Sequence, residues 1–257
     1  MILDEIVSKR KEHYKKIMEE FPLSTLISKI NSLEIEDNIK FYDLVSKKEF
    51  IYICECKKAS PSKGIIKENY NYIDIAKAYE KYGADCISCL TEPDYFLGSD
   101  EHLINIRKNV NIPILRKDFI FDEYQIYESK LLGADIILLI CSILDDEKLK
   151  RFISIAHSLS LGCLVETHSD EEIDRAIKAN AKVIGVNNRN LKDFTINNEL
   201  SIKLREKYPD ITLISESGIK GYEDIVNIKK ARLNGVLVGE YLMRADSIEL
   251  ALGELKK

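Results

Sequence analysis

The feature that most constrains the fold is a regular alternation, over residues 50–257, of short apolar segments and amphipathic helical segments. Each apolar segment favours a buried strand, and a pattern with helical spacing follows it. Strand–helix alternation implies right-handed crossovers and a parallel sheet, and eight such units imply a closed (β/α)8 barrel. The predicted strands are Ile51–Lys57, Cys86–Glu92, Pro113–Phe119, Asp135–Cys141, Gly162–His168, Lys182–Arg189, Thr212–Gly218 and Gly235–Leu242.

Two of the helix-to-strand turns share one pattern, Gly-Ala-Asp at residues 83–85 and again at residues 133–135. A glycine just past a helix and an acid before the next strand are typical of αβ turns. A doubly wound open sheet is the alternative, but it needs a Gly-rich first turn that we do not find. We therefore predict an α/β protein that forms a single (β/α)8 TIM barrel domain over residues 1–257, with residues 1–48 as an N-terminal helical extension.

Composition and charge limit the classes of function. Apolar residues make up 45% of the chain and charged residues 32%, the mix of an ordinary globular protein. The net charge of -5 argues against nucleic acid as the main partner, because a phosphate backbone requires a basic footprint. The sequence has no apolar run of membrane-spanning length and no signal-peptide pattern at the charged N-terminus. We expect a cytoplasmic monomer with no membrane partner.

Six cysteines lie in or beside the predicted strands. The spacings Cys54-x-Cys56 and Cys86-x-x-Cys89 could belong to metal or redox motifs. Their neighbours, however, are Ile, Leu and Val instead of the turn residues that a zinc knuckle needs. We expect these side chains to be small buried hydrophobic groups in a reducing compartment, and we expect no metal site.

The first predicted strand ends in two charges, Glu55 and Lys57. They are two residues apart, so they point to the same side of the strand. A loop with the sequence Ser-Pro-Ser-Lys-Gly follows. An ion pair that merely ends the strand is the alternative, but charges at the end of a buried strand are costly to maintain for stability alone. This stretch therefore predicts part of an active site.

Polar groups follow most of the other predicted strands as well. In a barrel the carboxyl ends of the strands meet at one mouth, where active sites lie. Each of these groups alone could be a solvated loop charge, but their joint occurrence predicts convergence on one site. For His168, which follows Glu166, we expect a supporting or loop role. The groups are Glu92, Lys117, Glu166, Asn187 with Arg189, Glu216 with Ser217, and Glu240.

The alternation of side chains along each strand refines this prediction. Arg116 and Asp118 share the face turned toward the helices and can pair there, so Lys117 between them faces the mouth. Glu216 points oppositely to Ser217. If Glu216 points into the barrel, the Ser217 side chain points away, and its backbone N–H can still bind a ligand at the mouth.

Glycines follow the last two predicted strands, at Gly218 and Gly239. Barrels commonly bind phosphate at this place through backbone N–H groups, and glycine lets the backbone approach the anion closely. Glycines needed only for tight turns are the alternative. A phosphate bound here requires Glu240 to turn its carboxylate away.

Eight motifs occur in order along the strands: Glu55-Cys56-Lys57-Lys58-Ala59-Ser60-Pro61-Ser62-Lys63-Gly64; Ile87-Ser88-Cys89-Leu90-Thr91-Glu92 with Phe96-Leu97-Gly98-Ser99; Leu115-Arg116-Lys117-Asp118-Phe119; Gly133-Ala134-Asp135 with Leu138-Leu139-Ile140; Leu164-Val165-Glu166; Gly185-Val186-Asn187-Asn188-Arg189-Asn190-Leu191; Ser215-Glu216-Ser217-Gly218-Ile219; and Val238-Gly239-Glu240. Together they resemble the motifs of indole-3-glycerol phosphate synthases. Cys56 and Cys89 stand where that family usually has aliphatic residues, and Asn190 stands where Asp is common.

The resemblance implies a lyase of tryptophan biosynthesis that needs no cofactor. Its sugar-phosphate substrate, 1-(2-carboxyphenylamino)-1-deoxyribulose 5-phosphate, undergoes ring closure, decarboxylation and dehydration to indole-3-glycerol phosphate. Lys117 would be the general acid and Glu166 would transfer protons. Lys57 would contact the substrate carboxylate or act as a second acid, and Glu55 would position Lys57. The sequence does not divide the acid and base roles among Glu55, Lys57 and Glu166. The implied catalytic residues are Glu55, Lys57, Lys117, Glu166, Asn187, Glu216 and Ser217. The implied binding residues are Ser60, Phe96, Phe119, Leu138, Arg189, Leu191, Gly218, Gly239 and Glu240.

Two alternatives remain at this stage. Another phosphate-handling barrel enzyme, such as phosphoribosylanthranilate isomerase or the tryptophan synthase α-chain, is one of them. The isomerase would want a cysteine base at the end of the first strand, where this chain has Glu55 and Lys57. A non-catalytic barrel is the other, but it would be expected to lack some of the ionisable residues at the mouth.

Overall fold

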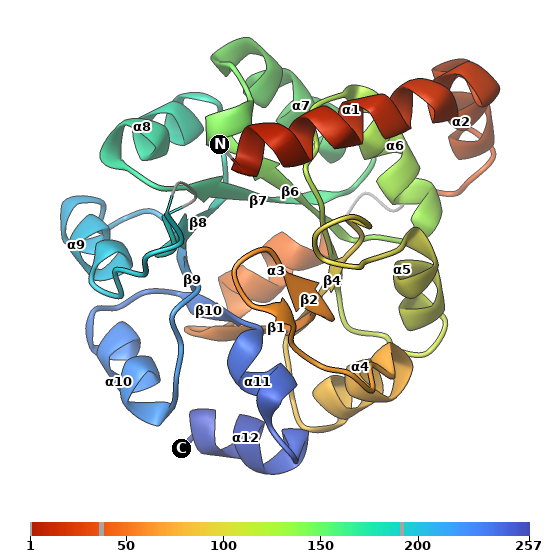
Figure 1. Ribbon diagram of the computed structural model, residues 1–257. Helices are drawn as coiled ribbons and strands as arrows, with labels where there is room; N and C mark the ends of the chain where they lie inside the picture. Colours follow the sequence, from red (N-terminus) through yellow and green to blue (C-terminus); the bar gives the residue numbers. More distant parts are fainter. Residues whose placement is uncertain (1, 36–38, 191–192) are drawn as a thin grey trace.

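Eight parallel strands close into a barrel at the centre of the molecule, and helices surround it (Figure 1). This computed structural model describes residues 2–35, 39–190 and 193–257. Neighbouring strands follow in the order β1-β10-β9-β8-β7-β6-β5-β4, so the first and last barrel strands pair and no edge is left. The predicted α/β barrel is confirmed. The strands are β1 (Ile51–Cys56), β4 (Cys86–Leu90), β5 (Ile114–Lys117), β6 (Ile136–Ile140), β7 (Gly162–Thr167), β8 (Val183–Asn187), β9 (Leu213–Glu216) and β10 (Gly235–Val238).

The helices after each strand bury their apolar faces on the outside of the barrel. They are α4 (Tyr72–Lys81), α5 (Asp100–Arg107), α6 (Glu123–Leu132), α7 (Asp146–Ser158), α8 (Asp170–Lys178), α9 (Leu200–Lys207), α10 (Tyr222–Lys230), α11 (Glu240–Arg244) and α12 (Ile248–Leu255), with a 3-10 turn η1 (Cys141–Ile143) after β6.

The two predicted Gly-Ala-Asp turns have the expected geometry. Gly83 and Gly133 adopt φ angles of 87° and 89°, a left-handed conformation that glycine reaches without strain. Each aspartate then satisfies a backbone donor at the start of a neighbouring strand. A carboxylate oxygen of Asp85 accepts from the Tyr52 N–H at 2.8 Å, and one of Asp135 accepts from the Ile114 N–H at 2.9 Å.

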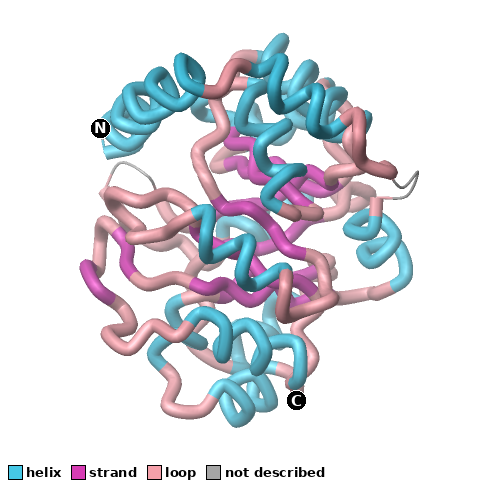
Figure 2. Tube along the Cα trace, turned by 90° about the vertical axis from the view of Figure 1, so that its right-hand side faces the viewer, coloured by secondary structure: helices cyan, strands magenta, loops and turns pink. Residues whose placement is uncertain are grey.

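The N-terminal extension is helical, as predicted, and its helices lie at both ends of the barrel. Helix α1 (Ile2–Glu20) lies along one side of the mouth, α2 (Leu23–Ile30) packs on α6, and α3 (Lys40–Lys47) lies at the opposite end (Figures 1 and 2). Phe41 of α3 is completely buried and packs with the residues that fill the barrel interior, such as Ile51. The division into domains stays a prediction.

All eight predicted strands extend past the observed ones, most by one or two residues at an end, and the last strand and the loop after β1 differ most. The last strand ends at Val238 instead of Leu242, because the chain turns at Gly239 and Glu240–Arg244 form helix α11 with a buried Leu242. The loop after β1 is partly ordered into a short antiparallel hairpin, in which β2 (Ala59–Ser60) pairs with β3 (Gly64–Ile65). Local patterns of apolar residues and turn formers do not reveal such short elements.

All six cysteines lie within the described ranges and are buried and free, as predicted. Burial raises the pKa of every one of these thiols. Among the described residues, no helix is long and apolar enough to cross a membrane. The same residues contain no group of three or more His, Cys, Asp or Glu side chains placed to hold a metal ion.

Candidate active site

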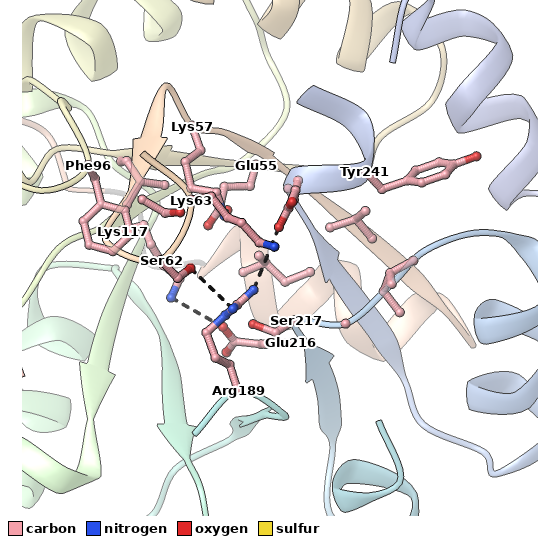
Figure 3. A pocket seen from close by; sticks show the side chains of 18 of the residues that line it. Glu55, Lys57, Ser62, Lys63, Phe96, Lys117, Arg189, Glu216, Ser217 and Tyr241 are labelled. Carbon is pink, nitrogen blue, oxygen red and sulfur yellow. Dashed lines mark hydrogen bonds and ion pairs between the residues drawn. The ribbon is translucent and has the colours of Figure 1, made fainter. Parts of the chain in front are cut away.

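A cavity of about 810 Å³ opens at the carboxyl ends of the barrel strands. Figure 3 shows charged side chains from β1, β5 and β9, and from the loop after β8, directed into this one space. Every predicted site residue that the structure describes lines the cavity. Leu191, the remaining predicted site residue, lies outside the described residues.

Lys117, the last residue of β5, places its ammonium between two carboxylates. Its Nζ lies 2.9 Å from Oε2 of Glu166 on β7 and 3.4 Å from Oε2 of Glu216, the last residue of β9. The Nδ2 amide of Asn187, at the end of β8, donates to Oε1 of Glu166 at 3.2 Å. Four strands therefore contribute to one polar cluster, which the convergence of strand ends predicted.

Burial and charge together set the protonation of this cluster. Burial disfavours the charge on Lys117, but the carboxylates of Glu166 and Glu216 outweigh it and raise the pKa of Lys117 well above its ordinary value. Burial also works against the charge on Glu166, yet the Lys117 ammonium holds the pKa of Glu166 below its ordinary value. Burial dominates at Glu216 and raises its pKa to about 7. The Lys117 ammonium thus contacts two carboxyl groups, and Glu216 keeps its proton to a higher pH than Glu166 does.

Two glycines make room for the inward carboxylates. A Cβ atom on Gly185 of β8 would lie 2.0 Å from Oε1 of Glu216. A Cβ atom on Gly239 would lie 2.2 Å from Oε2 of Glu55 and 3.0 Å from Nζ of Lys57. Sequence reasoning missed this role of Gly185, although an isolated glycine inside a strand often marks a close approach.

Glu55 and Lys57 form a second charged pair in the same cavity. The Lys57 ammonium donates to Oε2 of Glu55 at 2.5 Å, so the two side chains do share a face. Only 6% of the Glu55 side chain and 17% of the Lys57 side chain are exposed. The site therefore contains two ammonium–carboxylate units, one on β1 and one centred on β5, and both can exchange protons with a ligand between them.

Arg189 extends from the end of β8 toward the hairpin and α11 (Figure 3). Its Nη1 lies 3.5 Å from Oγ of Ser62, and its Nη2 lies 4.0 Å from Oε2 of Glu240. The other oxygen of Glu240 accepts from Nε of Arg244 at 3.0 Å. Two guanidinium groups therefore offset the negative charge of Glu240, the residue that we expected to turn away from a phosphate.

The apolar part of the cavity is built from Phe96, Phe119 and Leu138. The two phenyl rings lie with centroids 6.1 Å apart and planes inclined by 41°. Sequence analysis missed the contribution of the N-terminal extension, because no strand pattern connects α1 with the mouth. The residues of α1 that line the cavity are Ile2, Leu3 and Ile6.

Glu92 holds the loop that presents Phe96. Its carboxylate is completely buried and forms no ion pair with any residue that the structure describes. Instead it accepts hydrogen bonds from three backbone N–H groups. The donors are Asp94 at 3.0 Å, Tyr95 at 2.8 Å and Phe96 at 2.9 Å. The predicted charge at the end of this strand therefore supports the cavity wall without lining it.

Replacing Glu216 by Gln is expected to stabilise the protein at pH 8 but not at pH 5. The raised folded-state pKa means that stability is lost as pH rises from the ordinary carboxyl pKa, 4.5, through about 7, because the buried group must then lose its proton. Gln mimics the protonated acid and should recover about 2–3 kcal/mol at pH 8. Denaturant unfolding at both pH values measures this difference, and an equal effect of the substitution at both would contradict the assignment.

Comparison with known proteins identifies the family. The family model described as indole-3-glycerol phosphate synthase matches residues 3–255. The chain belongs to this family. It is 48% identical to the indole-3-glycerol phosphate synthase of Ruminiclostridium cellulolyticum over 257 residues, covering 100% of this chain and 99% of that protein. It is 47% identical to the enzyme of Endomicrobium trichonymphae, with 100% of both chains covered.

Solved structures of other enzymes share the fold alone. A 3-hexulose-6-phosphate synthase matches with a TM-score of 0.64 at 18% identity, covering 80% of this chain and 98% of that one. KGPDC from Streptococcus mutans matches with a TM-score of 0.63 at 12% identity, covering 80% and 94%. The family membership confirms the resemblance inferred from the strand-end motifs. The protein's activity is that of the family: it is a carboxy-lyase of tryptophan biosynthesis that acts on a sugar-phosphate.

Proposed function

We propose that Lys117 is the general acid of the ring closure. In this step the ring carbon that carries the carboxylate attacks the ketone carbon of the ribulose chain, and the ketone oxygen gains negative charge. The observation that supports this role most strongly is the position of the Lys117 ammonium between Glu166 and Glu216, 2.9 and 3.4 Å away. These carboxylates keep the group protonated until the developing oxyanion takes its proton.

Decarboxylation needs little from the protein. After ring closure the ring nitrogen is a cationic iminium, which accepts the electron pair of the breaking carbon–carboxylate bond. The substrate itself is therefore the electron sink, and we propose that the reaction uses neither a metal nor an organic cofactor.

Dehydration needs one acid and one base. We propose that Lys57 protonates the leaving hydroxyl group and that Glu166 removes the proton from the carbon next to the ring nitrogen. Glu55, 2.5 Å from the Lys57 ammonium, positions that acid. Over the whole reaction the protein donates two protons and accepts one, so each turnover takes one proton from solvent. Nearly buried acids and bases of this kind contribute on the order of 10²–10⁴ in rate each.

The remaining residues bind the substrate. Phe96, Phe119 and Leu138 pack against the aromatic ring, while Asn187 and Glu216 bind the ribulose hydroxyl groups. The phosphate lies against backbone N–H groups after β9 and β10. The residues proposed around the phosphate and the sugar chain are Ser60, Arg189, Leu191, Ser217, Gly218, Gly239 and Glu240.

Substrate that lacks the phosphate is expected to bind at least about 100-fold more weakly, because it loses several charge-assisted hydrogen bonds. A substitution of Gly218 tests where the phosphate binds. A Cβ atom on Gly218 would lie 2.0 Å from Oδ1 of Asn198, and its φ is +88°. Gly218→Ala should therefore weaken binding of the phosphorylated substrate alone. Gly253→Ala, in an open position on α12, is the control. Equal affinity for both substrates would refute the phosphate site.

We further propose that the protein acts as a cytoplasmic monomer and that nucleic acid and membranes are not its partners. The support for this is the net charge of -5 and a site built from one chain.

A further inference from the structure

His168 lies directly behind the proposed base Glu166. It follows β7, and its ring contacts two carboxylates from opposite sides. Nδ1 lies 3.4 Å from Oε2 of Glu172, in the first turn of α8, and the His168 backbone N–H donates to the same oxygen at 2.7 Å. Nε2 lies 3.5 Å from Oε1 of Glu166. The His168 side chain is 18% exposed, compared with 3% for Glu166.

The contact with Glu166 requires a proton between the two groups. Nε2 is buried and has no hydrogen-bond partner within the described part of the chain, and its 3.5 Å separation from Oε1 of Glu166 is long for a hydrogen bond. A neutral ring that donates from Nδ1 to Glu172 would turn the lone pair of Nε2 toward the Glu166 carboxylate. A proton on Nε2 or on Glu166 removes that repulsion, so the two groups are arranged to exchange one.

The charges around the ring favour the imidazolium form. Glu166 on β7 and Glu172 on α8 contact it, Glu216 on β9 adds a further negative charge, and Lys117 on β5 lies beyond Glu166. Burial works against the charge, but the hydrogen bond with Glu172 and the negative charges of the three carboxylates raise the pKa of His168 above its ordinary value. The thiol of Cys141, on η1, contacts the Glu172 carbonyl and stays protonated.

We propose that His168 is a positioning and proton-relay residue that is held by Glu172 and lends its Nε2 proton to Glu166 during turnover. This inference rests on the proposed roles of Glu166 and Lys117. Ring closure leaves Lys117 neutral, and Glu166 must be free of a proton before it can act as the base of the dehydration. The imidazolium gives its Nε2 proton to Glu166, which passes it over 2.9 Å to a neutral Lys117. The neutral ring keeps its Nδ1 proton and regains the Nε2 proton from Glu166, once that carboxylate has taken the carbon proton of the dehydration. Lys57, whose side chain is 17% exposed, takes the net proton of the turnover from solvent.

Replacing His168 by Gln tests the relay, because Gln retains a polar group near the position of Nε2 but cannot titrate near neutral pH. We expect kcat to fall by about tenfold at pH 6, where His168 carries its proton, with KM changed less than about twofold, a small part of the effect of a direct acid or base. The wild-type kcat should fall as pH rises through the His168 pKa, and the variant should lose this limb. His157→Gln is the control, since His157 pairs with Tyr42 at the other end of the barrel.

Two further variants keep the test decisive if His168→Gln folds poorly. His168→Ala leaves space for free imidazole, which should restore part of the lost kcat. Glu172→Gln removes a negative charge from the ring and should move the alkaline limb of kcat to lower pH. An unchanged kcat and pH profile in His168→Gln, or a loss in His168→Ala that imidazole does not restore, would overturn the relay.

The outcome is separable from the proposed function. If Lys117→Met is inactive while His168→Gln retains wild-type kcat at every pH, the relay alone fails. If Lys117→Met is as active as the wild type, the proposed function fails, whatever the His168 variants do.

Discussion

Lys117→Met is expected to lower kcat on the order of 10³-fold while the protein stays folded. Met fills the space of the lysine stem but cannot protonate the ketone oxygen, so the ring closure loses its general acid. Substrate binding should persist, because the apolar wall of Phe96 and Phe119 and the proposed phosphate site are untouched. The chain contains no Trp, so the indole fluorescence of the product is measured against tyrosine emission alone.

Lys63→Met is the matched control for this experiment. Lys63 also lines the cavity, on the hairpin side, but it takes no part in the proposed chemistry. Its replacement should change kcat by less than about threefold. Near-normal turnover of Lys117→Met, or equal losses in the two variants, would remove Lys117 from the mechanism.

Arg116→Met is expected to destabilise the protein by about 3–5 kcal/mol, because it breaks a buried ion-pair network and leaves the largely buried Glu128 without this cation. Arg116 belongs to β5, and its side chain is completely buried. Its Nη2 lies 2.8 Å from Asp100, 2.8 Å from Glu128 and 3.7 Å from Asp118. Parity along β5 predicted the pairing with Asp118 correctly. Arg10 of α1 also binds Asp118, at 2.6 Å, so this network fastens the N-terminal extension to the strand that carries Lys117.

Arg151→Met is the control for the stability measurement. Arg151 contacts both carboxylate oxygens of Glu123, at 2.8 and 2.7 Å, but its side chain is 65% exposed. Solvent screens such a pair, so this replacement should cost no more than about 1 kcal/mol. Denaturant unfolding of both variants gives the comparison. Equal costs would mean that the buried network contributes no more than a surface ion pair.

Much of the site was predictable because a barrel brings the carboxyl ends of its strands together. Glu55, Lys57, Lys117, Glu166 and Glu216 each sit at a recognisable strand end, and alternation along the strand decides which face each one takes. The remaining part was not predictable in this way. The apolar periodicity of α1 does not show that Ile6 lies at the mouth. Nor does the strand pattern show that Gly185 leaves room for the Glu216 carboxylate of the next strand.

The sequence by itself determined the class of fold and the chemical groups available at the mouth, because periodicity and strand ends are local properties of the chain. Only the tertiary structure decided which charges meet. Lys117 lies beside Glu166 and Glu216, and Glu166 lies against His168, because closure of the barrel sets the distances between strands. Those distances, together with burial, decide where each proton resides, since the interaction between charges depends steeply on their separation and on the exclusion of water.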